Sequence, residues 1–99
     1  MRRRQLGWSP GARNDLQQIY TYIADAGSPI NALRYVERIT AYCETLDYAS
    51  ERGQRRDDIR PGLRIIGFER RVAIAFEVDE ELVTILRIFY GGIDWEHAL

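Results

Sequence analysis

Arginine side chains are the groups in this sequence whose type and setting are best suited to binding chemistry. Arg87 lies within Leu82 to Tyr90, the most apolar strand-like segment of the chain. A lone charge in such a segment is costly to bury, so Arg87 must form an ion pair or face a cleft. Glu77 on the preceding segment is one candidate partner. The alternative is a guanidinium exposed on a helix-free face of a sheet and presented to a target.

A second group of arginines precedes that segment, close to the breaker Pro61-Gly62. One interpretation is that these clustered arginines form a basic rim. The alternative is a solvated edge whose charge is offset by Asp57 and Asp58. The group consists of Arg55, Arg56, Arg60 and Arg64.

The C-terminal segment supplies further candidate contact residues. Tyr90 is followed by Gly91-Gly92, where the backbone can turn sharply, and then by Asp94 and Trp95. Trp95 either fills the bottom of the core or serves as a contact residue, because tryptophan is enriched in interface hot spots.

Several chemistries lack the residues they need. His97 is the only histidine and Cys43 the only cysteine, and the chain has no lysine. A zinc site, a Cys/His nucleophile and a Schiff base are therefore not expected. Gly91-Gly92 is followed by no lysine-bearing helix and does not match a phosphate loop. We predict neither a metal nor a cofactor.

The N-terminal half predicts a strand and a helical hairpin within a single domain spanning residues 1–99. A short strand is expected over residues 2–8. Ser9-Pro10 and Ser28-Pro29 are helix start signals, and apolar residues then recur at helical spacing. Helices are expected over residues 10–25 and 29–48, folded back on each other because their link is short. Residues 50–62 are expected to form an exposed connection.

After residue 62 the apolar period changes from helical to alternating. Strands are expected over residues 63–68, 71–78 and 82–90, and short links make them an antiparallel meander. Residues 91–99 form a loop or a short helical turn. The expected fold is α+β, with two layers: a helical hairpin packed on an antiparallel sheet of three to four strands. Strict alternation in the last strand places Val83, Ile85, Arg87 and Phe89 on one face and Leu82, Thr84, Leu86, Ile88 and Tyr90 on the other.

Charge and hydropathy constrain the partners and the compartment. The net charge is −1, so neither bulk attraction to nucleic acid nor sequence-specific nucleic-acid binding is expected. The charge is distributed in blocks along the chain, which suits a specific protein partner. No apolar run is long enough to cross a membrane, and one unpaired cysteine fits a reducing compartment. We therefore expect a cytoplasmic protein.

The chain resembles ParE toxins over nearly its whole length. In the C-terminal half the resemblance is carried by Gly62-Leu63-Arg64, by Ala75 to Val78, by Val83 to Gly92 and by Asp94-Trp95-Glu96. In the N-terminal half it is carried by Ser9-Pro10, Ala12, Asp15-Leu16, Ile19 and Tyr22-Ile23. The arginine-bearing last strand followed by glycine and aspartate is the most specific part. Two positions depart from many ParE-like sequences, which have histidine in place of Tyr90 and arginine in place of Ile93.

The resemblance implies the toxin of a type II toxin–antitoxin system that poisons DNA gyrase by binding and forms a hetero-oligomer with a ParD-like antitoxin. Arg64 and Arg87 match arginines that recur in both the ParE and RelE branches. The implied target-binding residues are Arg60, Arg64, Arg87, Tyr90, Asp94 and Trp95.

Two alternatives stand beside this hypothesis. One is a RelE-like ribosome-dependent mRNA endoribonuclease, in which Arg64 and Arg87 stabilise the phosphate and Tyr90 moves a proton. The other is a regulatory domain that only binds an antitoxin.

Overall fold

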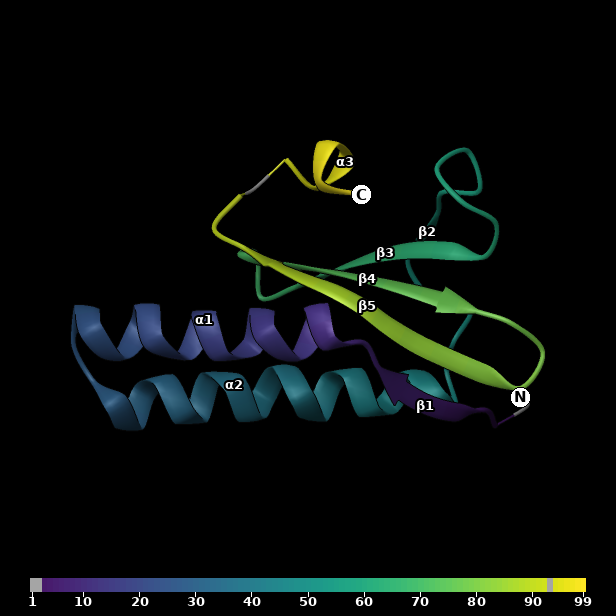
Figure 1. Cartoon of the computed structure of the whole chain (residues 1–99). Helices are drawn as coiled ribbons and strands as arrows, with labels where there is room; N and C mark the ends of the chain where they lie inside the picture. The colour runs from purple at the N-terminus through teal and green to yellow at the C-terminus, as the bar shows by residue number, and fades with distance from the viewer. Residues whose placement is uncertain (1–2, 93) are drawn as a thin grey trace.

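Two helices cover one face of a five-stranded sheet in the computed structural model, which describes residues 3–92 and 94–99 (Figure 1). The strand order is β1-β5-β4-β3-β2. The predicted α+β two-layer fold is confirmed, with a sheet that is larger than expected and mixed. The elements are β1 (Gln5–Trp8), α1 (Pro10–Ala26), α2 (Pro29–Glu44), the 3-10 turn η1 (Thr45–Asp47), β2 (Gln54–Arg55), β3 (Leu63–Phe68), β4 (Val72–Val78), β5 (Leu82–Tyr90) and α3 (Trp95–Ala98).

Both long helices begin at the predicted serine–proline signals. The Ser9 hydroxyl accepts a hydrogen bond from the Ala12 amide at 3.0 Å, and the Ser28 hydroxyl accepts one from the Asn31 amide at 3.3 Å. These side chains satisfy amides that have no partner inside the helix. The helices form the expected antiparallel hairpin, although α2 ends at Glu44 and tightens into η1 before residue 48.

The two outer strands account for the larger sheet. β1 pairs in parallel with the first half of β5, from Leu82 to Ile85. The strand predicted over residues 2–8 thus begins at Gln5, and Arg2 lies outside the described residues. β2 pairs with β3 inside the segment predicted to be an exposed connection. A strand of only two residues, both exposed, gives no periodic pattern that distinguishes it from a loop.

The main core lies between the helices and the sheet. Its fully buried members include Ile39, Leu46, Ile74, Phe76 and Ile85. Cys43 belongs to the same core, and burial raises the pKa of its thiol to about 12. The thiolate is therefore disfavoured, and this cysteine fills space as a small apolar side chain.

A β-bulge in β5 overturns the predicted face assignment of this strand. Arg87 pairs with Ala75 and Ile85 pairs with Phe76, so Leu86 is an extra residue opposite the Ala75–Phe76 step. Beyond the bulge, Ile88 joins Val83 and Ile85 in the helix-side core, whereas Leu86 and Phe89 lie on the helix-free face. An inserted residue shifts the side-chain alternation by one position, which strict alternation cannot anticipate.

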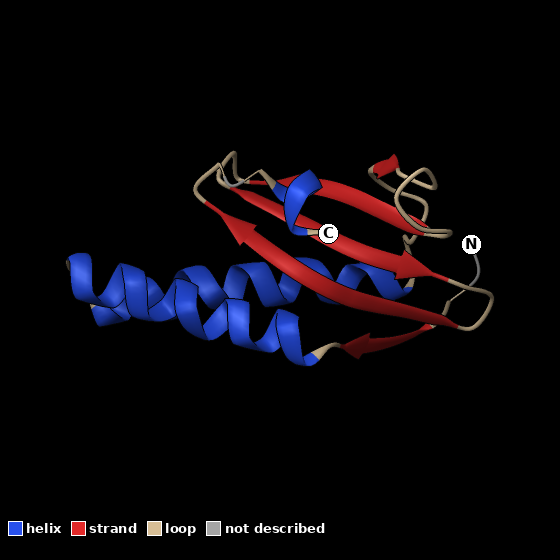
Figure 2. Cartoon of the chain, turned by 45° about the horizontal axis from the view of Figure 1, so that its top comes forward, coloured by secondary structure: helices blue, strands red, loops and turns tan. Residues whose placement is uncertain are grey.

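A second, smaller apolar cluster occupies the helix-free face. Its buried residues are Leu63, Ile65, Ala75 and Phe89, and Ile59 and Trp95 pack against them. α3 lies above this face, on the side of the sheet away from the long helices (Figure 2). The predicted turn at Gly91-Gly92 is confirmed, since both glycines adopt the left-handed backbone region with φ of 80° and 79°.

Candidate functional site

Arg87 forms a two-pronged ion pair with Asp15 of α1 and none with Glu77. Its Nε donates to Asp15 Oδ2 at 2.7 Å and its Nη2 donates to Oδ1 at 3.1 Å. The pair raises the pKa of the guanidinium further above its ordinary value. The guanidinium also lies 5.0 Å from the centre of the Phe89 ring. The proposed Glu77 partner is thus wrong, and the side chain remains 38% exposed at the sheet edge.

Local packing explains how Arg87 reaches α1 from a strand. A Cβ atom at Gly11 would lie 3.1 Å from Arg87 Cδ, so the glycine leaves room for the arginine stem to pass the first helical turn. Asp15 is buried, and its Oδ2 also accepts the backbone amide of Ile88 at 2.8 Å. At this point of the β5 edge, the carboxylate therefore accepts the backbone hydrogen bond that a neighbouring strand would otherwise accept.

Asp15 is a residue whose importance the sequence interpretation missed. It lies three residues after Ala12 and four before Ile19, and all three are buried. The sequence did contain a signal for it, because Asp15 is a charged residue at a position where the helical period of α1 predicts a buried apolar one. Buried carboxylates are found where they are paired, so the position pointed to an arginine partner elsewhere in the chain.

Arg60 and Trp95 lie on the helix-free face, as does the Cβ of Arg87. Arg60 Nη2 lies 3.0 Å from a carboxylate oxygen of Glu77. Trp95 contributes to the second cluster, and the Arg56 guanidinium lies 5.2 Å from its ring centre. Trp95 is half-buried, so it both contacts the cluster and presents part of its ring to solvent. Asp94 is exposed and contacts His97.

The predicted basic rim is largely neutralised by its own acids. Arg55 pairs with Asp57, and Arg56 pairs with Asp58 and Glu96. Arg56 lowers the pKa of the Asp58 carboxyl. The pKa of Asp57 is lowered first by the hydrogen bond from the Gly62 amide and then by Arg55. These bonds shape the segment that covers the helix-free face.

Arg64 and Tyr90 lie away from the helix-free face. Arg64 pairs across the ladder with Phe76, a residue of the helix-side core, so it faces the helix side of the sheet. Its guanidinium donates to the Arg52 carbonyl at 3.4 Å. Tyr90 also belongs to the helix side, where it packs edge-to-face on both Tyr22 and Tyr35 at 5.9 Å.

Ladder register separates Arg64 from Tyr90 along the sheet. Tyr90 pairs with Val72, which pairs with Phe68, whereas Arg64 lies four residues earlier on β3. That offset corresponds to roughly 13 Å at ordinary strand rise. The six predicted site residues therefore do not form one cluster.

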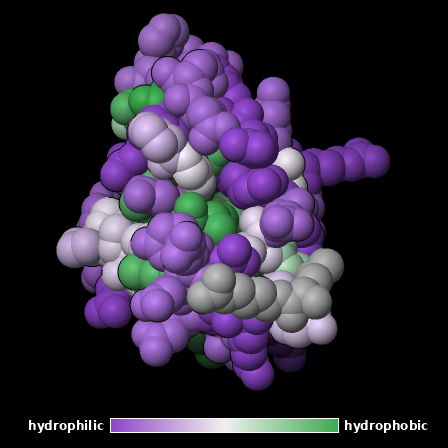
Figure 3. Space-filling view, turned by 90° about the vertical axis from the view of Figure 1, so that its right-hand side faces the viewer, coloured by the Kyte–Doolittle hydropathy of each residue, from purple (hydrophilic) through white to green (hydrophobic). Residues whose placement is uncertain are grey.

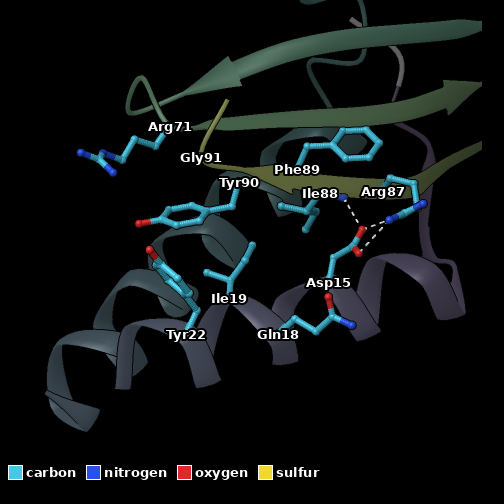
Figure 4. Close-up of a pocket in the computed structure, with 10 residues that line it drawn as sticks. All are labelled: Asp15, Gln18, Ile19, Tyr22, Arg71, Arg87, Ile88, Phe89, Tyr90 and Gly91. Atoms are coloured by element: carbon cyan, nitrogen blue, oxygen red, sulfur yellow. Dashed lines mark hydrogen bonds and ion pairs between the residues drawn. The ribbon is translucent and has the colours of Figure 1, made fainter. Parts of the chain in front are cut away.

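A groove of about 500 Å³ follows the outer edge of β5 next to α1 (Figure 4). It lies between the Asp15–Arg87 pair at one end and Tyr22, Tyr90 and Arg71 at the other. Within residues 3–92 and 94–99, no group of three or more metal-ligating side chains is gathered, and no helix is long and apolar enough to cross a membrane.

Comparison with known proteins identifies relatives of this chain. The family model for the ParE toxin of the type II toxin–antitoxin system parDE matches residues 6–95. No curated protein matches the sequence.

Two solved structures are similar in fold. A chain from the chromosomal ParDE toxin–antitoxin system of P. aeruginosa superimposes with a TM-score of 0.77 and 29% sequence identity, covering 89% of this chain and 96% of that one. A chain of the E. coli DinJ–YafQ toxin–antitoxin complex gives a TM-score of 0.53 at 13% identity, covering 90% and 93%.

Proposed function

Because this chain belongs to the ParE toxin family of type II toxin–antitoxin systems, we propose that it acts in the cytoplasm as a gyrase poison and is neutralised by a ParD-like antitoxin. In this proposal residues 1–99 act as a single domain that binds DNA gyrase without carrying out a reaction of its own.

The arrangement of residues on the helix-free side of the sheet is the observation that carries this proposal. Arg60, Arg87 and Trp95 lie there around an apolar cluster, with Asp94 next to Trp95. The Nη1 nitrogen of Arg87 makes no hydrogen bond within the described residues, so it can donate to a target. An apolar centre with arginine and tryptophan around it is typical of a protein-binding surface.

The ribonuclease alternative gains no support from the geometry. It requires Arg64, Arg87 and Tyr90 to converge on one phosphate, because general acid–base catalysis needs groups within hydrogen-bond reach of the same atoms. Arg64 and Tyr90 lie on the helix side of the sheet and roughly 13 Å apart along it, whereas Arg87 leaves from the other face. Binding therefore explains the site better than phosphodiester cleavage.

A gyrase assay with purified, antitoxin-free protein and plasmid DNA tests the proposal. We expect supercoiling to be blocked and cleaved plasmid to accumulate. Arg87→Gln should lose this activity, while Arg64→Gln, a matched change on the other face, should keep most of it. Circular dichroism of each variant verifies folding before its activity is interpreted.

Two outcomes would count against the proposal in different ways. Gyrase left untouched by a large excess of folded wild-type protein would overturn the target, and ribosome-bound mRNA cleavage would then be assayed. Equal loss of activity in Arg64→Gln and Arg87→Gln would keep the target but contradict the assignment of the helix-free side as the binding surface.

A further inference from the structure

A second hollow, of about 550 Å³, lies where the first half of α2 meets the β3–β4 turn and the end of β5. It shares Arg71 and Tyr90 with the groove of Figure 4. Three segments that are far apart in the chain thus bring arginine and tyrosine side chains to one place. The other polar residues that line this hollow are Asn31, Arg34, Tyr35, Arg38 and Glu69.

The hollow has an excess of positive charge. Arg38 donates to both carboxylate oxygens of Glu69, from Nε at 2.9 Å and from Nη2 at 3.0 Å, so these two charges offset each other. Arg34 and Arg71 are exposed, and neither forms an ion pair within the described residues. Three arginines and one glutamate leave a local charge of +2 on a chain whose total is −1. The guanidinium groups of Arg34 and Arg71 can therefore bind an anion.

Arginines near the opposite end of the sheet have structural partners. That end of the molecule carries the β4–β5 turn and is mostly hydrophilic (Figure 3). Arg3 forms an ion pair with Asp47 at 3.0 Å. Arg4 donates to the Asp79 carbonyl and to the Ser50 hydroxyl, both at 2.7 Å. These guanidinium groups hold segments of the chain together, which distinguishes them from the two unpaired arginines of the hollow.

Tyrosine hydroxyls add neutral donors beside these arginines. Burial raises the pKa of Tyr35, and Tyr90 and Glu69 raise it further. The Tyr35 hydroxyl therefore stays protonated at neutral pH and can donate to an anion. Tyr90 packs edge-to-face on Tyr35 and on Tyr22, with ring centres 5.9 Å apart in each pair. In Figure 4 the hydroxyl ends of Tyr22 and Tyr90 point to the side on which Arg71 lies.

The backbone of the β3–β4 turn holds the rim of the hollow in place. Glu69 and Arg70 both adopt the left-handed region, with φ of 47° and 67°, which is costly for residues with a Cβ atom. The two-pronged bond between Glu69 and Arg38 offsets part of this cost and ties the turn to α2. Arg71 follows the turn directly, and its carbonyl accepts the Gly91 amide at 2.9 Å. Its backbone is therefore fixed next to the end of β5.

The available groups favour a phosphate that carries a flat aromatic group. Guanidinium groups bind carboxylates and phosphates alike, but a phosphate monoester offers more acceptor oxygens and more charge to donors that come from several segments. Tyr22 is 65% exposed and presents ring surface on which a base can stack. A phosphate combined with a flat base is the chemistry of a nucleotide.

We propose that this hollow binds the phosphate of a nucleotide through Arg34 and Arg71, with the base stacked on Tyr22. The inference does not depend on the proposed gyrase target, because the hollow lies on the helix side of the sheet and the proposed gyrase contacts lie on the other. A free nucleotide and the phosphorylated end of a nucleic-acid strand present the same group.

Titration of the full chain, followed by NMR, tests the ligand class. The probes are adenosine monophosphate, adenosine and inorganic phosphate. We expect adenosine and inorganic phosphate each to bind roughly tenfold more weakly than adenosine monophosphate, since one lacks the charge and the other lacks the base. Adenosine that binds as tightly as its monophosphate would overturn the phosphate assignment. Inorganic phosphate that binds as tightly, or a folded chain that binds no adenosine monophosphate, would overturn the nucleotide assignment.

Charge-removing variants test the residues. Arg71→Gln and Arg34→Gln should each weaken binding of adenosine monophosphate roughly tenfold, because each loses a charged donor. Arg70→Gln is the matched control: it is adjacent and exposed, has the same charge change and does not line the hollow. Its affinity should stay within about twofold of wild type. Equal effects of Arg70→Gln and Arg71→Gln would show that only overall charge matters and would overturn the proposal.

Two further measurements test the base and the source of the phosphate. Tyr22→Ala should weaken binding of adenosine monophosphate and leave that of inorganic phosphate unchanged; unchanged binding of both would overturn the stacking assignment. A trinucleotide with a phosphorylated end distinguishes the sources: clearly tighter binding than that of adenosine monophosphate supports a strand end, and binding that is no tighter supports a free nucleotide. None of these measurements involves gyrase, so this inference and the proposed function fail separately.

Discussion

The face of the sheet that α1 and α2 cover and the face that they leave free are built from different residues. The covered face has a continuous core that includes fully buried side chains such as Ile39, Ile74 and Phe76. The free face has a small cluster whose cover consists of Ile59 and Trp95, with Arg56 stacked on the tryptophan. Stability is thus concentrated on one face, while Arg56, Arg60 and Trp95 gather at the other.

This difference indicates how a 99-residue chain accommodates both a core and the proposed binding surface. A domain of this size buries a limited fraction of its surface, so one well-packed layer must supply most of the stability. Residues on the other face can then be chosen for contact with a partner. Substitutions should accordingly affect stability and activity unequally on the two faces.

The largest expected effect is on the covered face. Phe76→Ala should lower the free energy of unfolding by about 3–5 kcal/mol, because it leaves a cavity in the centre of the main core. Urea denaturation followed by circular dichroism measures this loss. Phe89→Ala, which removes the same ring from the free face, should cost clearly less. Equal losses would contradict the contrast between the two faces.

Asp15 joins the two faces at the sheet edge, so its loss should have the next largest effect. Asp15→Ala should destabilise the protein by about 2 kcal/mol, since the buried Ile88 amide and the Arg87 guanidinium both lose their acceptor. Asp15→Asn keeps one acceptor oxygen and should cost less. A stability loss in Asp15→Asn as large as that in Asp15→Ala would show that the negative charge is what matters.

Trp95→Ala should separate stability from activity. The side chain is half-buried at the rim of the small cluster, so we expect a loss of only about 1 kcal/mol in unfolding free energy. Gyrase poisoning should fall much more strongly, because the ring belongs to the proposed contact surface. Thermal melts and the plasmid cleavage assay measure the two quantities. Full activity in a folded Trp95→Ala variant would restrict this tryptophan to a structural role.

The smallest expected effect is a loosening of the free face in acid. The pKa values of Asp57 and Asp58 are lowered from 3.8 by the Gly62 amide and by Arg56, respectively. Their stabilising contribution is therefore complete above the unfolded value and is lost as the pH falls through the lowered pKa values. Trp95 fluorescence, measured in a Trp8→Phe background, should change at a higher pH than far-ultraviolet circular dichroism. Simultaneous transitions would indicate that both faces respond as one unit.

The helices and central strands could be predicted because their signals are local. Ser9-Pro10 and Ser28-Pro29 start the two helices where expected, and the strands over residues 63–68 and 82–90 have the predicted bounds. β2 was not predicted, because pairing with β3 defines its two residues and no periodic pattern marks them.

The candidate site was predicted by residue type and only partly by position. The arginine in β5 was recognised as a residue that needs a partner, but its partner is Asp15, 72 positions away in the chain. Glu77, the expected partner, pairs instead with Arg60. Pairing between distant segments depends on how helices and strands pack, and spacing along one element does not contain that information.

By itself, the sequence determined the α+β class, the helical hairpin, the meander and the requirement that Arg87 be paired or exposed. These follow from capping residues, apolar periodicity and the cost of burying a charge, all of which act locally. The tertiary structure alone decided which face each residue of β5 occupies, because the single extra residue at Leu86 reverses the alternation after it. It also left the Ile88–Tyr90 edge open, since β1 ends its pairing at Ile85 when the chain turns into α1.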